Sequence, residues 1–175
     1  MSAVMTEPKM GLGIGRVART KTRGIARVRY QAVWFILMGA SLAFVAAGGY
    51  TVARAFDAKD QVKAQLAAEH ITTSEDASIP NVAVNSAETA QSEADVIRAH
   101  VLESTKGKTY AQMDRTDPAR TTAFNGAALR TSLLSAVLAF NVANLALGFG
   151  AFVAAIGLLG VFGLILLRSK IVKTE

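Results

Sequence analysis

Residues 132–167 read SLLSAVLAFNVANLALGFGAFVAAIGLLGVFGLILL, a run of thirty-six residues without a charged side chain. A second uncharged run covers residues 31–53. An apolar helix of about 20 residues is long enough to cross the ~30 Å hydrocarbon core of a bilayer. The two runs therefore predict an all-α membrane protein with two transmembrane helices, the first at residues 31–53.

The second run is longer than one membrane crossing requires. As a helix it would be ~54 Å long, whereas the hydrocarbon core accommodates only ~30 Å. Arg168 and Lys170 fix the cytoplasmic end of the run, and counting back about 20 residues places its outer boundary near Leu147. We therefore expect residues 147–167 to span the membrane and residues 129–146 to continue the same helix outside it.

The charges predict the orientation of the chain. Residues 1–30 carry seven basic side chains and one acidic, and residues 168–175 carry three basic and one acidic. Residues 57–128 carry seven basic and eleven acidic side chains, a net charge of −4. Because cationic flanks stay in the cytoplasm, we expect a two-span protein of the plasma membrane with both termini cytoplasmic. Residues 1–30 are then a basic cytoplasmic arm, 54–128 a loop-rich extracytoplasmic segment and 168–175 a cytoplasmic tail.

The first span is also expected to continue as a helix outside the membrane. Phe56, Val62 and Leu66 recur at helical spacing, and good helix formers extend to about Ala68. We expect the two extensions to form an antiparallel helical hairpin, in which these side chains face an apolar row on the second helix: Leu133, Val137 and Phe140. One amphipathic helix cannot cover a helix that is apolar nearly all round, so the remaining face predicts contact with another protein.

Small side chains mark the surfaces where helices can approach closely. Gly39, Ala43 and Ala47 recur every four residues in the first span, and glycine is frequent in the second. Two asparagines of the long run are suited to hydrogen bonds between helices. The predicted helix-packing and partner interface is Gly39, Ala43, Ala47, Leu133, Val137, Phe140, Asn141, Asn144, Gly150, Ala154 and Gly157.

The N-terminal arm interleaves basic and apolar residues over residues 10–30. This pattern is typical of segments that contact the headgroups of anionic lipids. The alternative is a flank that serves only to keep the N-terminus in the cytoplasm. The predicted lipid contacts are Arg16, Arg19, Lys21, Arg23, Arg27 and Arg29.

Local signals predict the remaining elements. Residues 71–91 read as a loop, and Ser92 followed by Asp95 resembles a capping box for a short helix at 93–103. Asp117 and the proline after it favour the start of a helix of around fifty residues. A turn at residues 148–150, which would divide the long run into two spans and place the C-terminus outside, is the alternative.

The sequence offers little chemistry. The chain has no cysteine, which excludes disulfides and cysteine nucleophiles. Neither uncharged run holds the ionisable side chains that ion and proton pathways need. His70, His100 and Glu103 permit one alternative, a metal-dependent, membrane-anchored enzyme. We otherwise expect no enzyme, no cofactor and no metal. We expect no nucleic-acid partner, because the net charge of +6 is unevenly placed.

Several short blocks between residue 65 and about residue 150 resemble a known family. They read QLAAE and IT at 65–72, SED at 74–76, ADVI at 94–97, KGKTYA at 106–111, DRTDPAR at 114–120 and LRTSL at 129–133. Together these blocks resemble a family of small two-span actinobacterial membrane proteins, whose members often carry the label of an aromatic ring-opening dioxygenase. The side chains of this chain give that label no support.

The resemblance implies a function as well as a location. Small two-span proteins of actinobacterial plasma membranes occur as accessory subunits of the respiratory cytochrome bcc–aa3 supercomplex. The resemblance therefore implies a non-catalytic accessory subunit whose partners are integral membrane proteins such as cytochrome bc and cytochrome oxidase subunits. A self-associating envelope protein without a fixed partner is the alternative that the residues leave open.

Overall fold

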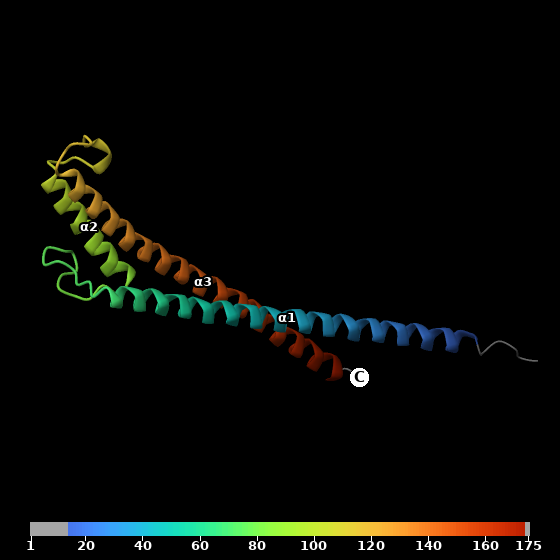
Figure 1. Ribbon diagram of the computed structural model, residues 1–175. Coiled ribbons are helices and arrows are strands. Elements are labelled where there is room, and N and C mark those ends of the chain that lie inside the picture. Colours follow the sequence, from blue (N-terminus) through green and yellow to red (C-terminus); the bar gives the residue numbers. More distant parts are fainter. Residues whose placement is uncertain (1–13, 174–175) are drawn as a thin grey trace, which may run out of the picture. The chain divides into compact units, whose positions relative to one another are not determined.

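The computed structural model describes the backbone of residues 14–173 and the side chains of residues 29–169. Its helices are α1 (Ile14–Ala68), α2 (Ala87–Ser104) and α3 (Arg120–Lys173), with a short 3-10 helix, η1, at Tyr110–Gln112 (Figure 1). Within this described range the only β-type pairing is an isolated bridge between Thr72 and Ala83. The prediction of an all-α chain with two long apolar helices is confirmed.

Both long helices contain a segment that is long and apolar enough to cross a membrane. These segments are Arg29–Ala68 in α1 and Arg120–Ser169 in α3. Only 6% and 11% of their most apolar stretches are buried inside the protein. The core helices of soluble proteins are mostly buried, so this exposure favours a lipid or protein environment around both segments.

The ends of the long helices follow the local signals in the sequence. α1 ends at Ala68, where the helix formers stop. At the start of α3 the Asp117 carboxylate accepts a hydrogen bond from the Ala119 backbone N–H at 2.9 Å. This is the bond expected from an N-cap aspartate followed by proline. Because α3 is helical through residues 148–150, the alternative of a turn there is wrong.

The predicted start of α2 is wrong by six residues. The capping box is formed by Ser86 and Thr89: the Ser86 hydroxyl accepts from the Thr89 N–H and the Thr89 hydroxyl accepts from the Ser86 N–H. The expected pair, Ser92 and Asp95, lies inside the helix. The buried Ser92 hydroxyl instead accepts a hydrogen bond from the Ile79 N–H at 3.0 Å. Serine at a helix start and serine anchoring a loop look alike in the sequence.

α2 ends in a turn that is closed by two backbone hydrogen bonds. The Gly107 N–H donates to the Leu102 carbonyl at 2.7 Å, and the Lys106 N–H donates to the Glu103 carbonyl at 3.2 Å. This pair of bonds is the Schellman motif, which requires a left-handed residue after the cap. Lys106 has φ 55° and Gly107 has φ 80°. Gly107 thus supplies one of the two positive φ angles at this helix end.

The segment between α1 and α2 is fixed to α2 by a buried carboxylate. Glu93 accepts hydrogen bonds from the Ser74 backbone N–H at 2.7 Å and from the Ser74 hydroxyl at 2.9 Å. Backbone bonds within the segment join Thr73 to Val82 at 2.8 Å and Val84 to Ile71 at 2.9 Å. Buried carboxylates need such donors, because desolvation of the charge is otherwise costly.

The chain divides into two compact units. One comprises Ala46–Ala154, and the other comprises the remaining parts of α1 and α3. The core of the first unit joins three helices and the loop before α2, through Leu66, Val84, Ala90, Ala94, Leu133 and Phe140.

Candidate partner interface

Within the unit Ala46–Ala154, α3 packs against α1 through part of the predicted set. Leu66, Leu133 and Phe140 are buried in one cluster, and Val62 and Val137 are partly buried against it. These positions match the apolar rows predicted from helical spacing.

The predicted contact of Phe56 with α3 is wrong. The Phe56 side chain is 52% exposed, whereas Ala55 is 3% exposed. The buried face of α1 follows Ala55, Val62 and Leu66, at the seven- and four-residue steps of a helix. One residue corresponds to about 100° of rotation around a helix, so Phe56 points away from the buried face.

A lysine joins α1 to one of the predicted asparagines. The Lys59 ammonium group donates to the Asn144 side-chain oxygen at 3.0 Å. The pKa of Glu88, in the first turn of α2, is lowered chiefly by its own backbone N–H and then by the Ser86 hydroxyl. Burial opposes this shift, and the positive charge of Lys59 adds the smallest lowering effect. The other asparagine, Asn141, is exposed. Lys59 was not among the predicted residues, because in the sequence it reads as a solvated cation.

Within the unit Ala46–Ala154, the two long helices meet at glycine. A Cβ atom built on Gly48 would lie 2.5 Å from the Gly150 carbonyl oxygen and 2.8 Å from the Ala154 Cα. A Cβ atom built on Gly150 would lie 2.9 Å from the Gly48 carbonyl oxygen. The backbones therefore touch, and only residues without a larger side chain permit this distance.

In the other unit the same kind of contact involves Gly157. A Cβ atom built there would lie 2.7 Å from the Ser41 carbonyl oxygen and 2.7 Å from the Val45 backbone nitrogen. The Trp34 indole N–H donates to the Leu164 carbonyl at 3.4 Å, and the Arg168 guanidinium lies 4.8 Å from the Trp34 ring centroid. The start of the first span and the end of the second are thus in contact.

The predicted small-residue row of α1 faces away from α3. Gly39 has no atom within 4 Å of a Cβ built on it, and Ala43 and Ala47 are exposed. The face that contacts α3 instead carries Ser41, Gly48 and Ala55. These small residues recur every seven positions, a signal that the four-residue row obscured.

A row of large apolar side chains remains uncovered on α3 within the unit Ala46–Ala154. Leu138 is 64% exposed, Val142 57% and Leu145 73%. Leu138 and Val142 also line a groove of about 500 Å³ between α1 and α3. Its α1 side is formed by residues with short or polar side chains, such as Ala55 and Thr51.

The lipid-contact prediction falls largely outside the side chains that the structure describes. Arg29 is exposed at the start of the described range. The side chains of the other five predicted residues lie outside that range: Arg16, Arg19, Lys21, Arg23 and Arg27.

The alternative metal site is not assembled. The His100 Nε2 atom lies 2.8 Å from an Asp76 carboxylate oxygen, and both side chains are more than half exposed. No group of three or more His, Asp or Glu side chains suited to a metal ion occurs among residues 29–169. The structure therefore does not bring His70, His100 and Glu103 together as a metal site.

Comparisons with known proteins do not assign the chain to a family. No family model matches its sequence. No curated protein and no solved structure matches it.

A third helix, α2, packs against α1 and α3, which was not predicted from the sequence. Ala90 and Ala94 of α2 are fully buried against the α1 and α3 cluster. Ala90, Ala94, Ile97 and Val101 follow helical spacing, and this periodicity is visible once α2 is extended to Ala87. α2 therefore covers part of the α3 surface that was expected to need an external partner.

Proposed function

We propose that this chain is a non-catalytic accessory subunit of a larger complex in an actinobacterial plasma membrane, the respiratory cytochrome bcc–aa3 supercomplex. The observation that carries the proposal is the exposed row Leu138, Val142 and Leu145 on α3. If the outer membrane boundary lies near Leu147, this row stands outside the lipid. Water disfavours exposed apolar surface by about 25 cal/mol per Å², and a protein partner would remove that penalty.

The proposed arrangement is a two-span protein whose helices extend outward as an antiparallel hairpin. Both termini lie in the cytoplasm. The contact of Trp34 with Arg168 supports one part of this arrangement, that both ends lie on the same side of the membrane, because the basic end of the second span lies beside the aromatic start of the first. Tryptophan and cationic side chains both favour the membrane interface.

Inside the membrane, the exposed row Gly39, Ala43 and Ala47 is available to a helix of the partner complex, since α3 occupies a different face of α1. Small side chains permit the close approach on which helix association in lipid depends. The basic N-terminal arm is proposed to contact anionic lipid. The respiratory assignment rests on the sequence blocks between residue 65 and about residue 150 that resemble the actinobacterial family.

Purification in mild detergent through a C-terminal tag tests the proposal. Stoichiometric co-purification of haem-containing subunits is the expected result. A pure homo-oligomer would instead indicate a self-associating envelope protein. Bound iron that is lost on His100→Ala would indicate a metal-dependent enzyme. A stable monomer with no partner contradicts the proposal.

Single cysteines report the orientation, because the natural chain has none. In intact cells, a membrane-impermeant maleimide should label Thr131→Cys but neither Ala151→Cys nor Ser169→Cys. After cell lysis, Ser169→Cys should also react while Ala151→Cys remains protected in the bilayer. Labelling of Ser169→Cys in intact cells would place the C-terminus outside and disprove the proposed topology.

A further inference from the structure

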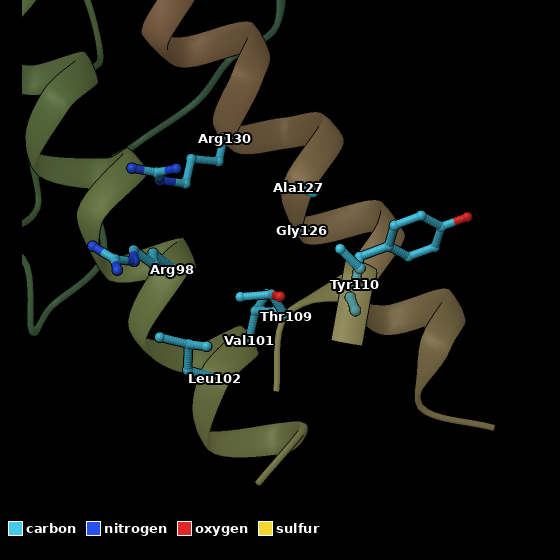
Figure 2. A pocket seen from close by; sticks show the side chains of 10 residues that line it. Arg98, Val101, Leu102, Thr109, Tyr110, Gly126, Ala127 and Arg130 are labelled. Carbon is cyan, nitrogen blue, oxygen red and sulfur yellow. The ribbon is translucent and has the colours of Figure 1, made fainter. Parts of the chain in front are cut away.

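A second cavity lies between α2 and α3, away from the exposed row. It has a volume of about 300 Å³, at the lower end of the range for small-molecule sites, roughly 300–1,000 Å³. Figure 2 shows two arginines on the same side of it, Arg98 from α2 and Arg130 from α3. Most of the remaining lining is apolar, including Val101, Leu102 and Ala127.

The two arginines lack a counter-charge. The recorded ion pairs in the described part of the chain are Arg54 with Asp57 and His100 with Asp76, and neither involves this cavity. The Nε atom of Arg130 is buried without a hydrogen-bond partner, and no other buried side-chain N or O atom of residues 29–169 lacks one. A buried donor without an acceptor is unfavourable, and more so when it is charged.

A third arginine nearby, Arg120, differs from these two because its guanidinium has hydrogen-bond acceptors within the protein. Arg120 donates to the Tyr110 carbonyl at 3.2 Å and to the Met113 carbonyl at 2.5 Å. Its guanidinium lies 4.0 Å from the centroid of the Tyr110 ring. Arg120 therefore fixes η1 against the start of α3. Among the described side chains no hydrogen-bond acceptor is found for the exposed Arg98 or for the partly buried Arg130.

We propose that this cavity binds a small organic anion, whose carboxylate lies between Arg98 and Arg130 and whose apolar body contacts Val101 and Ala127. Guanidinium groups bind carboxylates through paired, charge-assisted hydrogen bonds. The carboxylate supplies the counter-charge that the two guanidinium groups lack, and the apolar lining favours a hydrocarbon body over a bare inorganic ion. The site does not depend on the identity of the partner complex, but the source of its ligand rests on the proposed topology.

A lipid headgroup does not reach this cavity in the proposed topology. Arg130 precedes Leu147, the proposed membrane boundary, by seventeen residues of α3. This corresponds to about 25 Å along the helix axis. The ligand must therefore arrive from the extracytoplasmic water, which favours a small, soluble amphiphile.

Titration of the purified full-length chain with hexanoate and with 1-hexanol, followed by NMR chemical shifts, tests the site. The two probes share the apolar body and differ in the charged group. Hexanoate should bind saturably and at least about tenfold more tightly than hexanol, the ratio expected from a charge-assisted bond worth ~1.5 kcal/mol or more.

Three variants and a control locate the binding. Arg130→Gln and Arg98→Gln should each weaken hexanoate binding about tenfold. Ala127→Leu, which fills the cavity and keeps both arginines, should abolish it. Arg115→Gln removes an exposed arginine that does not line the cavity and should leave binding unchanged. Unchanged circular dichroism shows that each variant is folded.

The proposal is overturned by any of three results. These are no hexanoate binding up to about 10 mM, a concentration at which even a weak site of about −3 kcal/mol would be occupied, equal affinity for hexanol, or full binding by folded Arg130→Gln. A fourth result would overturn it as well: a loss of binding in Arg115→Gln as large as in Arg130→Gln, because the effect would then reflect net charge.

Discussion

Gly48→Ala will lower the thermal unfolding midpoint of the purified chain in detergent by about 10 °C. The added methyl group would lie 2.5 Å from the Gly150 carbonyl oxygen and 2.8 Å from the Ala154 Cα. Both neighbours are backbone atoms, so the helices must separate, and overpacking of this kind costs about 1–3 kcal/mol or more. For a chain of this size, each 1 kcal/mol shifts the midpoint by about 2–4 °C.

The adjacent glycine provides the matched control. A Cβ atom built on Gly49 meets no atom within 4 Å. Gly49→Ala should therefore leave the midpoint unchanged or raise it slightly, since alanine favours a helix by up to about 1 kcal/mol over glycine. The two substitutions are chemically identical, so opposite signs isolate the contact with α3. Equal midpoints would mean that these helices do not touch at Gly48.

The double variant Leu138→Glu, Val142→Glu should lose its partner while the fold is retained. Both side chains are exposed in the isolated chain, so the new carboxylates can remain hydrated there. In a complex they would be buried without counter-charges, and central contacts of an interface are each worth about 2 kcal/mol or more. Co-purification of the partner should fall at least about a hundredfold.

A second pair of exposed sites controls for added charge. Thr121→Glu, Asn125→Glu places two carboxylates at the same four-residue spacing on the same helix, away from the exposed row. This variant should co-purify with the partner as the unmodified chain does. Full recovery of the partner with the Leu138 and Val142 variant would show that the row is not the interface.

The long helices could be predicted from the sequence because their signals are local. The length of the two uncharged runs indicated the membrane-spanning helices, and Asp117 before a proline indicated the start of α3. The rotation of α1 about its axis could not be predicted with the same accuracy. The prediction placed Phe56 on the buried face, whereas the structure buries Ala55 and exposes Phe56. An error of one residue along the helix was enough to assign the wrong side chain to the contact. The contact face of α1 is the one that carries Gly48, about two turns before Ala55.

The cavity between α2 and α3 had no signal in the sequence. Arg98 and Arg130 belong to different helices, and each reads alone as a solvated cation. Only the folded chain shows that both line one apolar cavity without an acidic partner. The alternative metal site illustrates the reverse case, in which suggestive residues are not brought together as a site.

Within the unit Ala46–Ala154, Glu93 couples the loop before α2 to the helix itself. Its carboxylate holds both the backbone and the hydroxyl of Ser74, and Ser92 beside it holds Ile79. The segment formed by residues 71–84 is thus hydrogen-bonded to α2 at two neighbouring residues, Ser92 and Glu93. A ligand or partner that shifts α2 would therefore also move residues 71–84, because these hydrogen bonds join the two.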